Sequence, residues 1–147
     1  MKKWLKLVLA ILVCEVAGLI GSIFTFPSIP TWYASLVKPS FNPPGWLFAP
    51  VWTILFALMG ISLYLAWPAG KKAFGAQLLL NVLWSVLFFG FHSPLLAFIE
   101  IIILWIAILL NIIVFYKKSK PAAYLLIPYL LWVSFAAALN LFIVILN

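Results

Sequence analysis

The side chains that usually carry enzyme chemistry are scarce in this sequence of 147 residues. Its only acids are Glu15 and Glu100, its only histidine is His92 and its only cysteine is Cys14. A zinc site needs about four Cys, His or carboxylate ligands, and a hydrolytic centre needs a nucleophile held beside a base. We therefore expect no metal site, no intramolecular disulfide and no hydrolytic active site.

Tryptophan is the abundant functional residue, with eight copies in the chain. Three stripes of aromatic or small residues have helical spacing: Trp52 and Phe56; Trp84 and Phe88; and Trp132, Ala136 and Asn140. If these stripes converge, they form an aromatic cavity suited to a flat, apolar ligand held by stacking. The alternative is that they fill an ordinary core, and spacing alone favours this second interpretation.

The composition places these residues in a membrane. Hydrophobic residues make up 68% of the chain and charged residues only 7%, which excludes a soluble domain and a disordered one. The net charge of +7 does not indicate nucleic acid, because the aromatic-rich remainder is suited to lipid. The fold class predicted is an all-α integral membrane protein.

Five segments are long enough to cross a bilayer as helices. They run over residues 4–26, 44–66, 73–91, 95–116 and 122–146, within a single domain covering 1–147. Pro44, Pro94 and Pro121 stand where a first helical turn begins, the position at which proline costs least. Pro50 and Pro128 lie inside segments and predict kinks that free backbone carbonyl groups.

The lysines predict the orientation of the bundle. With five segments, eight lysines fall on the side of the N-terminus and only Lys38 on the other. By the positive-inside rule, the N-terminus is cytoplasmic, and the C-terminus and first loop lie outside. Glu15 interrupts the first apolar run, so we expect this segment to be retained rather than cleaved as a signal peptide.

Polar side chains within these segments each need a reason, because lipid does not solvate them. Glu15 lies about 16 Å along the helix from Trp4, near mid-membrane, and must face protein or be protonated. Glu100 lies nearer the outer end of the fourth segment. The amides Gln77, Asn81, Asn111 and Asn140 are interpreted first as interhelical hydrogen-bonding groups.

Two further features concern packing and the long first loop. Ala10, Cys14, Gly18 and Ser22 recur at steps of four, which predicts close helix packing within the bundle or between subunits. The loop 27–43 contains four of the ten prolines together with Trp32, Tyr33 and Phe41. Its stiff, aromatic character predicts a lid over the outer end of the bundle, whereas the alternative is an interfacial belt of aromatics.

Several stretches resemble one known family. Residues 32–46 read WYASLVKPSFNPPGW, and residues 50–60 read PVWTILFALMG. Residues 77–85 read QLLLNVLWS and residues 128–140 read PYLLWVSFAAALN. Together these resemble, in order and over nearly the whole chain, the translocator protein family, also called TspO/MBR, tryptophan-rich sensory proteins or peripheral-type benzodiazepine receptors.

The resemblance implies a five-helix bundle, usually a homodimer, with a ligand pocket under the first loop. Family ligands are porphyrins such as protoporphyrin IX and haem, sterols in animals, and benzodiazepine-type drugs; no cofactor beyond such a ligand is expected. The pocket residues implied by matching motifs are Trp32, Trp52, Phe56, Asn81, Trp84, Phe88, Glu100, Trp132 and Ala136. The chain lacks the Tyr and basic residue of the animal cholesterol pattern, and a prokaryotic cell membrane is expected.

Three functions are compatible with these observations. The first is a receptor or carrier that binds tetrapyrroles, with Lys38 or loop amides meeting the propionates at the outer rim. The second is light-dependent porphyrin degradation, for which the resemblance implies Trp52 and Trp132 and the sequence offers no other catalytic group. The third is an ion-coupled transporter using Glu15 and Glu100, although five segments do not divide into two equal repeats.

Overall fold

The computed structural model describes residues 1–147 and confirms the predicted five-helix bundle. Five helices are long and apolar enough to cross a membrane: Lys3–Tyr33, Gly45–Ala66, Lys71–Gly90, Pro94–Lys118 and Lys120–Leu146. Their α-helical parts are α1 (Lys3–Ser28), α2 (Phe48–Ala66), α3 (Lys71–Ser85), α4 (Pro94–Lys118), α5 (Lys120–Leu125) and α6 (Ile127–Leu146). No strand is present.

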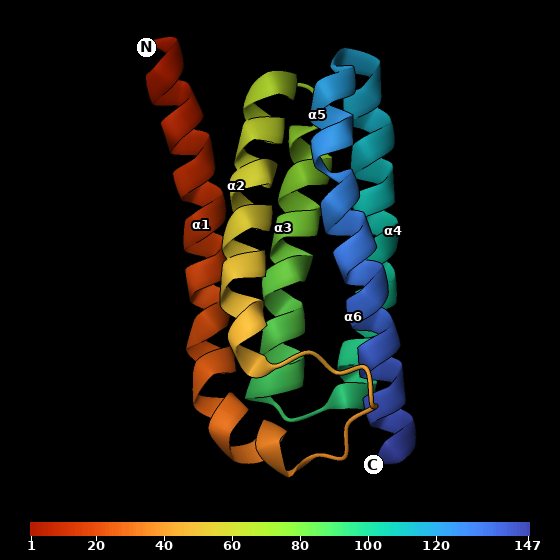
Figure 1. The fold of residues 1–147 in the computed structure, drawn as a ribbon. Helices are drawn as coiled ribbons and strands as arrows, with labels where there is room; N and C mark the ends of the chain where they lie inside the picture. The colour runs from red at the N-terminus through yellow and green to blue at the C-terminus, as the bar shows by residue number, and fades with distance from the viewer.

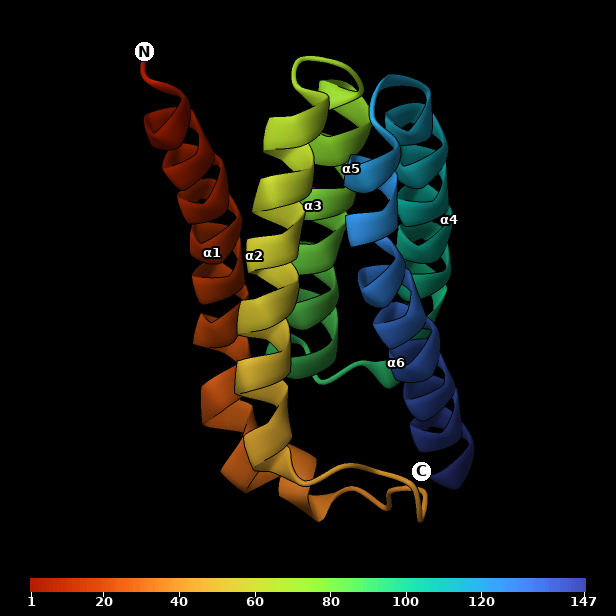
Figure 2. The same ribbon diagram turned by 45° about the horizontal axis from the view of Figure 1, so that its top comes forward.

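The helices run along one common direction and form a closed ring of neighbours (Figure 1). Helix α1 packs on α2 and α3, α4 packs on α3 and α6, and α2 closes the ring against α5. The N-terminus lies at the same end as the α2–α3 and α4–α5 turns, whereas the first loop and the C-terminus lie at the other end. The first turns of α1 lean away from α2 (Figure 2). The topology thus gathers eight of the nine lysines at one end.

Small residues on α1 and α2 pack within the chain. A Cβ atom added to Gly60 would collide with the backbone of Ile11, and one added to Gly18 would lie 2.6 Å from Cε2 of Phe56. Cys14, on the same stripe as Gly18, is fully buried. The small-residue stripe therefore brings α1 against α2 inside one subunit.

Proline marks the helix ends largely as predicted. Pro94 and Pro121 lie in the first turns of α4 and α5, whose N-caps, Ser93 and Ser119, each accept a backbone N–H. The fifth membrane segment is interrupted at Leu126, just before Pro128. The N–H of Leu126 donates to Ala123 O. The carbonyl of Ala122, four residues before Leu126, accepts the hydroxyl of Ser62 at 2.6 Å and so ties two helices together.

Two boundaries differ from those predicted. Pro50 lies in the first turn of α2, where no intrahelical N–H is lost, so it does not interrupt that helix. The first helix passes through Pro27 and continues as a π-helical turn to Tyr33, so the loop expected from residue 27 is helical in its first part. Thr31 Oγ1 donates to Pro27 O at 2.9 Å. Helical backbone that satisfies its own polar groups outweighs the stop signal of proline in lipid.

Candidate ligand-binding cavity

A cavity of about 180 Å³ lies in the half of the bundle nearer the first loop, between α1, α2, α3 and α6. The three predicted stripes converge on it. Its lining includes these members of the predicted site: Trp52, Phe56, Asn81, Trp84, Phe88, Trp132 and Ala136. The remaining wall includes small and polar residues of α1 together with residues of the other helices. Of the two alternatives that the sequence left open, the structure has the aromatic cavity rather than a filled core.

The aromatic walls contain pairs of neighbouring rings, one stacked and two tilted. Trp84 and Phe88 are stacked, with ring centroids 5.0 Å apart and planes inclined by 19°. Trp52 and Phe56 lie 5.6 Å apart at 32°. Trp132, on α6, contacts Phe135 at 5.5 Å between centroids. These pairs present ring surfaces from three helices, which is the geometry that a flat ligand needs for stacking.

Hydrogen bonds between helices fix the walls. The indole N–H of Trp84 donates to Asn140 Oδ1 at 3.0 Å, and Asn140 Nδ2 donates to Pro94 O at 2.8 Å. One tryptophan of α3 is thereby tied to α6 and to the start of α4. Such a bond holds the ring in one orientation, because a buried N–H without an acceptor is costly.

The floor of the cavity is a second buried polar network. Asn81 Nδ2 donates to the hydroxyl of Tyr129 at 2.8 Å, and this hydroxyl donates to Gln77 Oε1 at 2.8 Å. Tyr129 is fully buried and its ring lies 6.3 Å from that of Trp52. The interhelical role predicted for Gln77, Asn81 and Asn140 is confirmed. Asn111 differs: it is fully buried, and neither amide atom has a partner.

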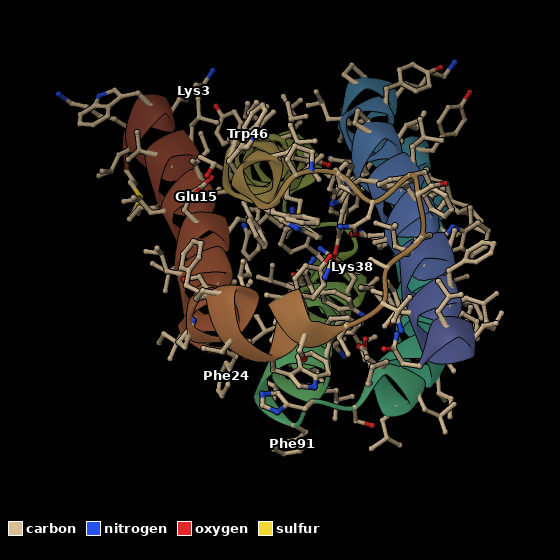
Figure 3. The ribbon with its side chains drawn as sticks, turned by 60° about the horizontal axis from the view of Figure 1, so that its bottom comes forward. Lys3, Glu15, Phe24, Lys38, Trp46 and Phe91 are labelled. Atoms are coloured by element: carbon tan, nitrogen blue, oxygen red, sulfur yellow. The ribbon has the colours of Figure 1, made fainter.

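The first loop crosses the end of the bundle opposite the N-terminus, from α1 to α6, and returns to α2 (Figure 3). Asn147 clamps it: Val37 N donates to Asn147 Oδ1 at 3.0 Å, and Asn147 Nδ2 donates to Val37 O at 2.8 Å. Phe41 packs against Phe135 and Phe142 of α6. The loop is therefore held over the end of the bundle through contacts with α6.

The loop is also tied to itself. Tyr33, which lines the cavity, donates its hydroxyl proton to Asn42 Oδ1 at 2.9 Å. The ammonium of Lys38 donates to Tyr33 O at 2.9 Å and to Leu36 O at 3.1 Å, and it lies 4.8 Å from the centre of the Tyr33 ring. Lys38 is thus held at the rim, above the cavity rather than in it.

Two residues of the predicted site do not line the cavity. Trp32 stacks on His92, with centroids 4.5 Å apart and planes inclined by 6°, and reaches the cavity only through its edge contact with Phe88. Glu100 is 5% exposed, and its carboxyl oxygens have no partner. Helix α4, which carries Glu100, contributes no residue to the lining. The spacing of residues could not reveal either placement.

Other lining residues were not predicted as ligand contacts. Glu15, Gly18, Gly21 and Ser22 form the α1 wall, and Tyr33 covers the cavity from the loop. The stripe of small residues could have identified the α1 residues as a cavity wall, because small side chains leave space where they face aromatic rings. The sequence indicated packing at this stripe, and the structure shows packing at Gly18 together with a hollow beside it.

Comparison with known proteins agrees with this architecture. Residues 10–146 match the TspO/MBR family. The chain is 51% identical to Tryptophan-rich protein TspO of Archaeoglobus fulgidus, with 97% of each chain aligned. It is 48% identical to Tryptophan-rich protein TspO of Chlorobaculum tepidum, covering 99% of this chain and 98% of the relative.

More distant relatives include an animal protein. The chain is 36% identical to Translocator protein of Ovis aries, covering 93% of this chain and 87% of the relative. The family match over residues 10–146 reaches all five membrane-length helices. This protein is an integral membrane protein, and it belongs to the TspO/MBR family.

Proposed function

We propose that this protein is a membrane receptor or carrier that binds porphyrins, such as protoporphyrin IX and haem, and similar flat apolar ligands in the aromatic cavity. The observation that carries the proposal is the convergence of Trp52, Trp84 and Trp132 on one hollow. A sensory or transport role is in keeping with the names of relatives, among them Tryptophan-rich sensory protein of Cereibacter sphaeroides and Translocator protein of Homo sapiens.

Binding a tetrapyrrole requires the cavity to enlarge. Its volume of about 180 Å³ is below the roughly 300–1,000 Å³ typical of sites for drug-sized ligands. The first loop is the element best placed to yield, because Asn147 and Phe41 hold it through side-chain contacts alone. We infer that enlargement of the cavity around a tetrapyrrole involves displacement of this loop from α6.

The nature of the cavity wall favours metal-free porphyrin. His92 stacks on Trp32 and does not line the cavity, so it does not offer an axial ligand to haem iron there. Stacking on tryptophan does not require a metal. We therefore expect protoporphyrin IX to bind at least as well as haem, with propionates at the rim near Lys38.

Light-dependent degradation is a second candidate, and one observation favours it. Trp52 on α2 and Trp132 on α6 line the same cavity, so both would face one bound porphyrin. Product analysis after illumination of the complex separates degradation from binding: intact porphyrin after prolonged light would exclude the enzymatic role.

The cellular membrane and the orientation of the protein in it are part of the same proposal. By the positive-inside rule, the eight lysines at one end of the bundle support a cytoplasmic N-terminus, with the first loop and the C-terminus outside. The membrane that we propose is that of a prokaryotic cell. The homodimer stays a prediction, since the structure contains one chain.

Titration with protoporphyrin IX tests the proposal. Purified protein in detergent should show saturable quenching of tryptophan fluorescence, and Trp52→Ala should weaken the affinity by about tenfold through loss of a stacking surface. Trp4→Ala is the matched control, because Trp4 is 60% exposed at the far end of α1. Absence of saturation, or equal affinity in wild type and Trp52→Ala, would overturn the proposal.

A further inference from the structure

The aromatic cavity opens sideways between α1 and α2. On one lip, Leu19 and Phe26 line the cavity although they are 64% and 56% exposed. On the other lip, Ala49 and Thr53, one turn apart on α2, line it and are also exposed. Because both helices are membrane-length segments, this mouth faces the bilayer rather than the water above the loop.

Glu15 lies at the inner corner of this mouth. It falls between the two points where α1 touches α2, one turn from the contact of Ile11 with Gly60 and one turn from the contact of Gly18 with Phe56. Figure 3 shows it on the side of α1 that faces α2. Glu15 lines the cavity and is partly exposed, so a molecule passing the mouth meets its carboxyl group.

No side chain neutralises Glu15. The cavity lining contains no lysine, and Lys6, the nearest lysine on α1, is nine residues away, about 14 Å along the helix. The neighbouring hydroxyls are already used: Ser22 donates to Leu19 O at 2.6 Å and Thr53 to Ala49 O at 2.8 Å. The cavity therefore offers Glu15 no cation, and these two hydroxyls are not available as donors to it.

A carboxyl group beside aromatic rings is complementary to a nitrogen cation. Its oxygens accept hydrogen bonds from an ammonium group, and as a carboxylate it also neutralises the ligand charge. The Phe56 ring lies against Gly18, one turn from Glu15, and Trp52 follows on α2. Ring faces at this position attract a cation further, whereas a ligand carboxylate would be repelled.

We propose that Glu15 is a specificity-determining residue of the cavity, which selects flat aromatic ligands carrying a protonated amine over neutral and acidic ones. The inference rests on the proposed function, namely that the aromatic cavity holds a ligand. It goes beyond that function by naming the charge class that the mouth favours. For a porphyrin, it places the propionates away from Glu15, at the loop end of the cavity.

Three pyrene probes with one ring system test this selectivity: 1-pyrenemethylammonium, 1-methylpyrene and 1-pyrenecarboxylate. Energy transfer from tryptophan to pyrene reports binding to protein in a non-ionic detergent. Wild type should bind the ammonium probe most tightly and the carboxylate probe most weakly. Glu15→Gln should weaken the ammonium probe by about tenfold and leave 1-methylpyrene within about twofold. Comparing each probe between variants cancels its partition into micelles.

Glu15→Asp keeps the charge and should keep most of the preference for the ammonium probe. Trp52→Ala should weaken all three probes, because it removes a wall that they share. An unchanged ratio of ammonium to methyl affinity in Glu15→Gln would overturn the role of Glu15 while leaving the cavity intact. Absence of saturable binding by any probe in wild type would overturn the cavity as a ligand site and the selectivity with it.

Discussion

The two halves of the bundle use the same helices in opposite ways. In the half near the N-terminus, Gly60 lets α1 reach α2, and Phe74 stacks on Phe115 with centroids 6.0 Å apart. In the half near the first loop, small residues of α1 face tryptophan side chains that are held in place by hydrogen bonds and stacking, and a cavity remains between them. Small residues therefore allow close helix packing where the facing side chains can move in against them. Where the facing side chains are held rigidly, the same small residues leave a cavity.

A polar layer separates the halves. The hydroxyl of Tyr129 bonds to Asn81, which faces the cavity, and to Gln77, which is fully buried. On the side of the N-terminus this layer borders a packed core, and on the side of the first loop it borders the aromatic cavity. Loosening the packed half should cost stability, whereas altering the hollow half should change ligand binding.

The largest effect is expected from Gly60→Ala. Its Cβ would meet the backbone of Ile11, so α1 must move away from α2, and we expect a loss of about 3 kcal/mol in unfolding free energy. Helical circular dichroism during thermal unfolding in detergent measures it. Gly75→Ala is the matched control, because nothing lies within 4 Å of a Cβ at Gly75; its stability should rise by about 0.5–1 kcal/mol. Equal behaviour of the two variants would contradict the close contact.

Replacing two buried amides should change the unfolding free energy by smaller amounts, in opposite directions. Asn140→Leu removes the acceptor of the Trp84 N–H and should lower the unfolding free energy by about 2 kcal/mol. Asn111→Leu removes an amide whose atoms have no partner and should raise it by about 1 kcal/mol. Asn140→Leu alone should also weaken porphyrin binding, by about fivefold, since Trp84 loses its fixed orientation. Destabilisation by both variants would mean that Asn111 has a role not shown by its contacts.

The smallest effect is expected at the loop. Asn147→Ala removes the pair of hydrogen bonds to Val37, each on the order of 1 kcal/mol. Stopped-flow fluorescence with protoporphyrin IX should show association and dissociation both faster by about two- to fivefold, with little change in affinity. Unchanged rates would mean that ligand entry does not depend on release of the loop from α6.

Much of the fold could be predicted because lipid imposes simple rules. Apolar length indicated the five segments, and Pro94 and Pro121 marked helix starts as their missing N–H groups require. Pro27 was misleading because membrane helices tolerate proline, whereas the sequence interpretation treated it as the end of the helix. The sequence could not decide this competition between local propensity and lipid.

The site was predictable only along each helix. Spacing placed Trp52 with Phe56 and Trp84 with Phe88, but it could not say that Glu100 does not line the cavity. Nor could it pair Asn147 with Val37, which are 110 residues apart. Glu15 was visible as a costly residue in a membrane, but its position at the mouth depends on where α1 and α2 touch.

The central claim is that a flat ligand stacks on the tryptophans of the cavity, and a structure determined with protoporphyrin IX bound tests it most directly. The account predicts the macrocycle within about 4.5–7 Å, centroid to centroid, of at least one of Trp52, Trp84 and Trp132, with its propionates toward the loop. A macrocycle bound on the lipid-facing surface or on the outside of the loop, with the cavity unchanged, would contradict the account.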